Sequence, residues 1–260
     1  MIICADDFGL SQDVDEAISI LADERKIDAV SCMVALPRFA LESLDIAKKF
    51  PANVQIGLHL TLTDIEPVCR SAADIRSLID ADPGLFRPFG SLLRRSVVGL
   101  INPRHVLAEA VEQIKRFDQL FGRTPAFVDS HLHIHQFPRI REGVIAAVLA
   151  IPQEERPWVR NSYSPVSYII KQGVSPAKIF GISFFGRKMH RRLIESGVKT
   201  NNGFAGIYDY NRYQEYGQYL ARFTSCLKDP TAVLMAHPGL QEPWRRAEYT
   251  ALRALTVLSA

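Results

Sequence analysis

The chain has 260 residues, of which 47% are hydrophobic and 23% charged, and it carries a formal net charge of +3 at pH 7. This is the composition of an ordinary globular protein, and it excludes intrinsic disorder, collagen-like repeats and a coiled coil. The net charge is too small to indicate binding to nucleic acid.

The first part of the chain repeats one pattern, a short apolar stretch followed by a stretch with helical periodicity. Strands are expected over residues 1–5, 29–36 and 54–62, and helices from Ser11 or Asp13 and over residues 38–50. Residues 64–102 break the pattern, because Pro, Gly and Arg are scattered among only short helical hints. An irregular stretch of this length usually belongs to a functional cover, so we expect either a lid over the site or an oligomer contact.

The pattern returns with Asn102 and Pro103, which predict the start of a long helix that ends at Gly122. Residues 164–203 give a weaker signal, with two helices that have no clear bounds. Further strands are expected over residues 126–130, 158–160 and 232–236, and further helices over residues 138–150, 211–227 and from Arg245 onward. Alternating strands and helices predict a parallel sheet, and this length without a dinucleotide-binding fingerprint favours a single-domain α/β barrel over residues 1–260.

Polar groups with metal or acid–base chemistry follow four of the expected strands at the point where each strand ends. They are Asp6 and Asp7 after residues 2–5, His59 after residues 54–58, Asp129 and His131 after residues 126–128, and His237 after residues 232–236. Barrel enzymes build their active sites at this edge, because all strand ends and their loops meet there. Four strand ends that carry such groups therefore indicate a functional site.

The pair Asp6 and Asp7 does not need to share one role. Adjacent side chains of an extended chain point to opposite sides, so one carboxylate can bind a cation while a turn at Gly9 brings the other toward the same cavity. An alternative is that the pair opens a turn and caps the helix from about Ser11.

Three histidines recur at every second position after Asp129. If this segment stays extended, the alternation places Asp129, His131, His133 and His135 on one side of the chain. So many imidazoles, separated by apolar residues, indicate a metal site or a catalytic site. His59 between two leucines and His237 before a Pro-Gly turn carry little information alone.

Outside these motifs, residues 187–192 (RKMHRR) form the one basic cluster. It lacks interleaved aromatic residues, which favours a solvated helix face over a contact with phosphate or a membrane surface. The longest apolar run, residues 143–151, is far shorter than the roughly 20 residues of a membrane helix. The four scattered cysteines and the lack of a basic N-terminal stretch predict reduced thiols, no signal peptide, no membrane span and a cytoplasmic location.

Taken together, the motifs resemble those of the YdjC-like carbohydrate deacetylases, the family of chitooligosaccharide deacetylases and hopanoid-biosynthesis deacetylases. The resemblance spans most of the chain and rests on residues 5–11 (ADDFGLS), 57–59 (GLH), 121–125 (FGRTP), 129–138 (DSHLHIHQFP) and 237–238 (HP). Residues 164–203 are the least covered, and this stretch could hold substrate-selecting residues.

The resemblance implies a distorted TIM-like (β/α) barrel that holds one divalent cation. Its ligands would be Asp7, His59 and His131, which leaves Asp6 as the catalytic carboxylate. Three protein ligands with open positions suit a hydrolytic metal site. Two imidazoles suit zinc better than magnesium, although the family is often described with magnesium.

The implied reaction is hydrolysis of an N-acetyl group on an amino sugar, such as an N-acetylglucosamine oligosaccharide or a related glycoconjugate, to acetate and a free amine. In it, Asp6 takes a proton from the attacking water and His237 protonates the leaving nitrogen. Asp129 would orient a metal-binding imidazole, and His133 and His135 would support the ligands or contact sugar hydroxyls.

Two alternatives remain at this stage. Asp129, His131 and His133 also fit the D-x-H-x-H signature of metal-dependent phosphoesterases, although that motif normally opens a chain. The protein could also be a metal-containing carbohydrate-binding protein without catalysis. A homo-oligomer is compatible with either.

Overall fold

A computed structural model describes residues 1–80 and 84–255 of the chain. Its centre is one curled sheet of seven parallel strands, in the order β5-β4-β3-β2-β1-β7-β6. The strands are β1 (Ile2–Phe8), β2 (Ala29–Cys32), β3 (Gln55–Leu60), β4 (Phe127–Ser130), β5 (Trp158–Val159), β6 (Phe204–Ala205) and β7 (Val233–Ala236).

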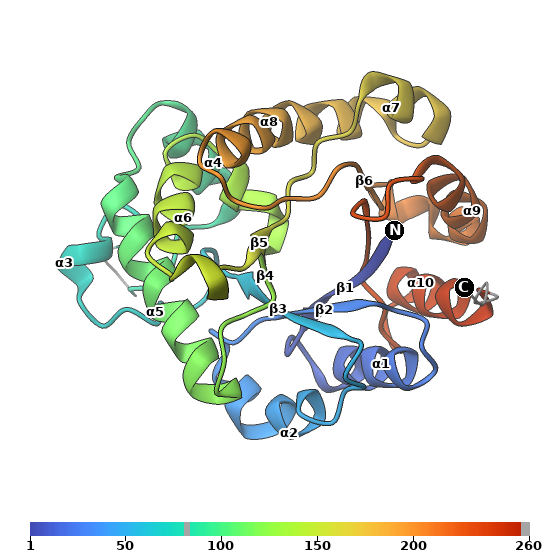
Figure 1. Ribbon diagram of the computed structural model, residues 1–260, viewed down its shortest axis with the longest axis horizontal. Helices are drawn as coiled ribbons and strands as arrows, with labels where there is room; N and C mark the ends of the chain where they lie inside the picture. The colour runs from blue at the N-terminus through green and yellow to red at the C-terminus, as the bar shows by residue number, and fades with distance from the viewer. Residues whose placement is uncertain (81–83, 256–260) are drawn as a thin grey trace.

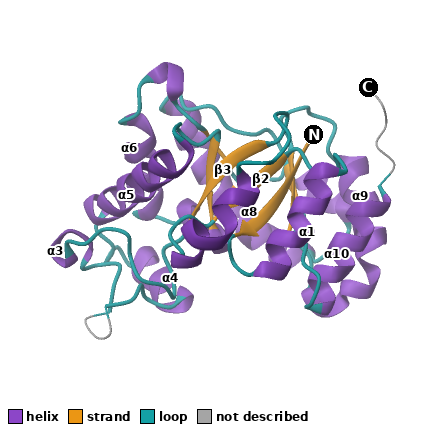
Figure 2. Ribbon diagram, turned by 90° about the horizontal axis from the view of Figure 1, so that it is seen from below, coloured by secondary structure: helices purple, strands orange, loops and turns teal. Residues whose placement is uncertain are grey.

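Helices surround this sheet, as Figure 1 shows, and Figure 2 views the same arrangement from below. They are α1 (Gln12–Asp23), α2 (Leu44–Ala47), α3 (Ala72–Ile75), α4 (Phe89–Val97), α5 (Pro103–Phe121), α6 (Ile140–Leu149), α7 (Val166–Gln172), α8 (Pro176–Glu195), α9 (Tyr216–Cys226) and α10 (Pro243–Ala254). None of the helices in the described ranges is long and apolar enough to cross a membrane.

The sheet is nearly closed into a barrel. Its strand order follows the chain cyclically, with β5 and β6 at the two edges. Between these edges, Val159 of β5 forms a parallel bridge with Thr200, which lies just before β6. The Val159 amide donates to the Lys199 carbonyl over 2.9 Å, and the Thr200 hydroxyl donates to the Val159 carbonyl over 2.6 Å. This confirms the predicted distorted TIM-like barrel.

Local sequence signals explain the best-predicted helix, α5. The Asn102 side chain accepts a hydrogen bond from the Arg104 amide over 3.0 Å, and Pro103 occupies the first turn. At the other end, Gly122 has a φ of 66°, a conformation that glycine adopts without the steric cost of a side chain. Both ends of the helix lie where the sequence predicts them.

Other segments differ from the prediction. The strand expected over residues 1–5 continues through the carboxylates to Phe8, and the helix expected over residues 211–227 consists of a 3₁₀ segment, Tyr210–Glu215, followed by α9. The cover segment, residues 64–102, contains the regular helix α4, while residues 81–83 lie outside the described residues. The two-residue strand β6 was not predicted.

Candidate active site and metal centre

The two adjacent carboxylates reach the same end of the sheet because β1 contains a bulge. Ala5 pairs with Val30 of β2, but the next pair joins Phe8 to Cys32, so β1 holds one extra residue between the two pairs. Asp7 lies in this bulge with a φ of 67°, which is uncommon for a residue with a side chain. The chain therefore bends at Asp7, two residues before the turn that the sequence suggested at Gly9.

Asp7 meets two histidines from neighbouring strand ends. Its Oδ1 lies 3.3 Å from Nε2 of His59, which belongs to β3, and 3.0 Å from Nδ1 of His131, which directly follows β4. One ligand atom from each residue lies within 4.8 Å of the other two. A carboxylate oxygen and two imidazole nitrogens at this spacing are a donor set suited to a divalent cation such as zinc.

The charges around Asp7, His59 and His131 are those expected of a site that binds a cation. Burial alone would raise the pKa of Asp7, but hydrogen bonds from His131 and His59 hold it well below its usual range. Burial disfavours protonation of His59, but the charge of Asp129 and the hydrogen bonds to Asp129 and Asp7 together outweigh burial and raise the pKa of His59 to about 10. The other Asp7 oxygen, Oδ2, accepts from the Arg245 guanidinium over 2.7 Å, so it is held away from the histidines.

The orientation of His59 is fixed from behind by two partners. Its Nδ1 lies 2.7 Å from Oδ1 of Asp129 and 2.9 Å from the Ser31 hydroxyl. These contacts turn Nε2 toward Asp7. A carboxylate behind an imidazole in this way fixes its tautomer and raises its basicity, as is usual for histidines that bind metals.

Asp6 is held by a residue that sequence reasoning missed. Arg160, the residue after β5, is fully buried, and its guanidinium donates hydrogen bonds to both carboxylate oxygens of Asp6 over 2.7 and 2.6 Å. The same guanidinium lies 2.9 Å from Oδ2 of Asp129, and the nearby carboxylates raise its pKa despite burial. The sequence contained one signal for this ion pair: an arginine at the last position of the strand expected over residues 158–160. A charged side chain in a buried strand needs a partner of opposite charge.

His237 lies beside Asp6 at the next strand end. The β1–β7 register pairs Ala5 with Ala236, so Asp6 and His237 are the next residues of adjacent strands. Burial lowers the pKa of His237 to about 4, and its Nδ1 has no hydrogen-bond partner among the described residues. Its backbone amide donates to the buried Glu248 carboxylate over 2.6 Å.

The three closely spaced histidines have three different surroundings, because residues His131–Gln136 form a 3₁₀ turn with positive φ at Leu132 and His133. The extended conformation considered for this segment is therefore wrong. His131 is one of the three potential metal ligands, with Asp7 and His59, whereas His133 lines the adjacent pocket. His135 is buried below, between the Ser130 hydroxyl at 2.6 Å and the Arg160 carbonyl at 2.7 Å.

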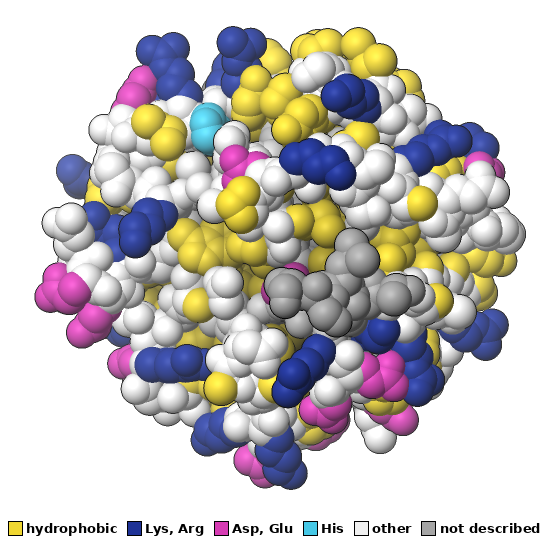
Figure 3. Space-filling model, turned by 45° about the vertical axis from the view of Figure 1, so that its right-hand side comes forward, with side chains coloured by type: hydrophobic (Ala, Val, Ile, Leu, Met, Phe, Trp, Pro, Cys, Tyr) yellow, Lys and Arg dark blue, Asp and Glu magenta, His cyan; other side chains and the backbone are white. Residues whose placement is uncertain are grey.

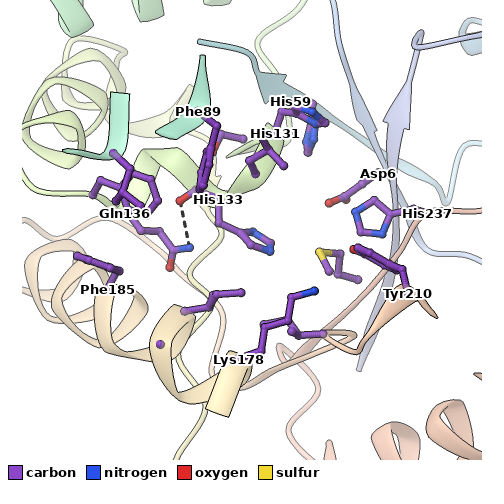
Figure 4. A pocket seen from close by; sticks show the side chains of 18 of the residues that line it. Asp6, His59, Phe89, His131, His133, Gln136, Lys178, Phe185, Tyr210 and His237 are labelled. Carbon is purple, nitrogen blue, oxygen red and sulfur yellow. Dashed lines mark hydrogen bonds between the residues drawn. The ribbon is translucent and has the colours of Figure 1, made fainter. Parts of the chain in front are cut away.

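A pocket of about 420 Å³ opens over these strand ends. Figure 4 shows Asp6 and His237 on one side of it, His133 and Gln136 on another, and Lys178 across from them. Much of the remaining lining is apolar and comes from both covering helices, with Phe89 and Leu93 from α4 and Ala177, Gly181, Ile182 and Phe185 from α8. The expected cover segment and the weakly predicted segment 164–203 thus both contribute to the pocket.

Comparisons with known proteins agree with this architecture. A family model described as "YdjC-like protein" matches residues 1–259. A carbohydrate deacetylase of Xenopus laevis is 33% identical over 224 residues, which cover 76% of this chain and 71% of that protein. A chitooligosaccharide deacetylase of Yersinia enterocolitica is 29% identical over 140 residues, or 54% of this chain and 52% of that protein.

Among solved structures, a protein named for cellobiose-phosphate cleavage, from Enterococcus faecalis V583, superposes with a TM-score of 0.69. The match covers 97% of this chain and 90% of that one at 22% sequence identity. At that identity the likeness concerns the fold.

Proposed function

The chain belongs to the YdjC-like protein family, and we propose from this premise that it is a metal-dependent hydrolase that removes N-acetyl groups from amino sugars. The products would be acetate and a free amine. The names of the relatives, carbohydrate deacetylase and chitooligosaccharide deacetylase, support this activity. N-acetylglucosamine oligosaccharides or a related glycoconjugate are the proposed substrates. We also propose a cytoplasmic location, with which the four free, buried cysteines agree.

One observation carries the proposal. Asp7, His59 and His131 bring a metal-type donor set to the edge of a pocket that Asp6 and His237 line from adjacent strand ends. Amide hydrolysis needs these parts: positive charge near the carbonyl oxygen, a base for the attacking water and an acid for the leaving nitrogen. A zinc or magnesium ion held by the three ligands would supply a Lewis acid that polarises the carbonyl and acidifies water.

In this mechanism Asp6 is the general base. Because Arg160 holds both of its oxygens, the carboxylate keeps one orientation at the pocket wall. Asp6 accepts a proton from the water that attacks the acetamide carbon. The ion pair fixes the geometry of the carboxylate, and geometry is the first requirement for a general base.

His237 is the proposed general acid. Since burial lowers its pKa to about 4, it is neutral at pH 7 before the reaction and must first receive a proton. The source that we assign to this proton is Asp6, on the adjacent strand end, which gains a proton as water attacks. The protonated imidazole then gives this proton to the leaving nitrogen, which is too basic to depart as an anion.

The phosphoesterase alternative has less support from the geometry. Its signature would require His133 to bind the same ion as His131, yet His133 belongs to neither of the two groups of potential metal ligands among the described residues, which are Asp7, His59 and His131, and Cys4, Asp6 and Asp129. Burial also lowers the pKa of His133 well below its usual value, so this imidazole adds no positive charge for a phosphate.

A single assay tests the proposal. The purified protein, loaded with zinc or magnesium, is incubated with N-acetylglucosamine oligosaccharides and, separately, with sugar phosphates. We expect acetate release that a strong chelator abolishes and added cation restores, with no phosphate release. Phosphate release without acetate release would transfer the assignment to the phosphoesterase reaction.

A further inference from the structure

The helices α7 and α8 expose large apolar side chains to solvent. On α7, Val166 and Ile170 are 59% and 74% exposed. On α8, Phe180 and Phe184 are 58% and 53% exposed. Single exposed apolar residues are common on proteins, but four on two contacting helices form a patch that requires an explanation.

On α8 the apolar residues continue directly into positive charge. Phe180, Phe184, Arg187, Lys188 and Arg191 follow one another at positions i, i+4, i+7, i+8 and i+11, and all five are exposed, so they form one stripe along the helix. The Lys188 ammonium lies 4.5 Å from the centre of the Phe184 ring. Figure 3 shows hydrophobic and basic side chains together along the upper edge of the molecule, where Figure 1 places α7 and α8.

The segment that contains α7 and most of α8 carries only positive charge. Residues 161–194 contain six Lys and Arg residues and no Asp or Glu. The whole chain carries +3, so the rest of the protein carries 3 − 6 = −3. At the end of α8, Glu195 pairs with Arg191 and Arg192, which leaves Arg187 and Lys188 beside the phenylalanines without a carboxylate partner among the described residues.

We propose that this face, formed by Val166, Ile170, Phe180, Phe184, Arg187, Lys188 and Arg191, docks on the surface of an anionic lipid membrane. Phenylalanine and aliphatic side chains at one end of an interfacial helix enter the boundary between headgroups and acyl chains, and Lys and Arg contact anionic headgroups. Charge complementarity favours such a surface over a second copy of this chain, because a second copy would bring the same cations together.

The proposed orientation has a consequence for the pocket. The opposite side of α8 lines it with Ile182 and Phe185, and the rings of Phe184 and Phe185 lie 5.5 Å apart. The docking face and the pocket wall are therefore two sides of one helix. A protein docked through this face would hold its pocket next to the membrane surface.

Vesicle sedimentation tests the proposal independently of any enzymatic activity. The full chain is mixed with vesicles of equal parts phosphatidylglycerol and phosphatidylcholine, or of phosphatidylcholine alone. We expect binding to the anionic vesicles that weakens at high salt. Replacing Arg187, Lys188 and Arg191 together by Gln should lower this binding about 100-fold, and the pair Phe180→Ser and Phe184→Ser should lower it at least about tenfold.

Matched controls lie on the other side of the molecule. Gln at Lys48 and Lys49, which follow α2, and at Lys115 of α5 removes the same charge, and Leu41→Ser removes a side chain that is 83% exposed. These controls should bind like the parent protein, and all variants should keep its thermal stability because the changed side chains are exposed.

Three results would overturn the proposal. The first is an absence of binding to anionic vesicles above that to phosphatidylcholine. The second is an equal loss of binding in the docking-face and control variants, which would indicate a general charge effect. The third is self-association that the two Phe→Ser changes abolish while vesicle binding is absent, which would assign the face to a second copy of the chain.

Discussion

Asp6 and Asp7 are neighbours in the chain, but they have different partners. Arg160 holds both oxygens of Asp6, whereas Asp7 shares one oxygen with His59 and His131 and the other with Arg245. A metal ligand must hold the cation in the ground state, while a general base acts only as the water loses its proton. Two carboxylates in sequence can therefore be separated by experiment.

We expect Asp6→Asn to keep the bound cation and lose activity. The amide preserves the shape of the side chain but not its basicity, so kcat should fall by roughly 10² to 10⁴ while metal content stays near one cation per chain. Asp7→Asn removes a charged ligand instead, so metal content should fall and excess cation should restore part of the activity. Metal content and acetate release are measured for both variants at low and saturating cation.

Thermal stability is the control for this pair of variants. If the two aspartates only shaped the bulge in β1, both variants would lose stability alike and would not separate in metal content. Loss of the cation by Asp6→Asn together with its retention by Asp7→Asn would reverse the two assignments.

At the scale of the element, α8 is the helix whose position decides the pocket. It approaches the chain closely at Gly186, where an added Cβ would lie 2.6 Å from the backbone of Ser162 and of Tyr163. Backbone atoms cannot move aside as a flexible side chain can, so any larger residue at this position must push the helix outward. At Gly181, on the same helix, a Cβ would have no neighbour within 4 Å.

We therefore expect opposite effects from two glycine-to-alanine changes on α8. Gly186→Ala should lower the free energy of unfolding by about 1–3 kcal/mol through overpacking. Gly181→Ala should leave it unchanged or raise it by up to about 1 kcal/mol, because alanine favours the helix. Urea unfolding measures both, and equal stability of the two variants would show that α8 does not depend on its contact with residues 162–163.

The elements that sequence patterns predicted well are those whose signals are local. The helix α5 has its cap at Asn102 and its stop at Gly122, and the buried strands have continuous apolar runs. The site is also predictable in outline, because parallel strands bring their ends together. Asp6, Asp7, His59, Asp129, His131 and His237 were all found by their place at strand ends.

What could not be predicted depends on tertiary contacts. Nothing local requires positive φ at Asp7, Leu132 or His133, yet these conformations create the bulge in β1 and the turn after β4. Arg160 is remote in sequence from Asp6, so their ion pair exists only once the sheet has curled. The turn also explains why His135 is part of the core while its near neighbours face the pocket.

At the scale of the whole molecule, the barrel concentrates charge in its interior and balances it. Three buried carboxylates, Asp6, Asp7 and Asp129, lie against the guanidinium groups of Arg160 and Arg245 and the imidazole of His59. Buried charges are tolerated when each has a partner. Around this centre lie groups whose charged form burial disfavours, and these control how stability depends on pH.

Two of these groups, His135 and Glu248, should change the stability of the fold in opposite directions as pH falls. Burial lowers the pKa of His135 from its usual 6.5 to about 4. As pH falls from 7 to 5, this histidine therefore becomes protonated in the unfolded chain but stays neutral in the folded chain. His135 therefore stabilises the fold fully above pH 6.5, and this contribution is lost on acidification. Burial raises the pKa of Glu248 from 4.5 to about 7, so the folded chain takes up the proton first and gains stability over the same range.

The variants His135→Gln and Glu248→Gln test these two signs, because glutamine does not titrate. His135→Gln should be less stable than the parent at pH 7, where the neutral imidazole of His135 stabilises the fold. Between pH 7 and pH 5 the gap between the parent and His135→Gln should narrow by about 2 kcal/mol, since only the parent loses the histidine contribution. Over the same range the free energy of unfolding of the parent should rise by about 2 kcal/mol relative to that of Glu248→Gln, since only the parent gains by protonation. Urea unfolding at both pH values measures the gaps, and parallel pH profiles for all three proteins would mean that neither group titrates differently in the folded and unfolded states.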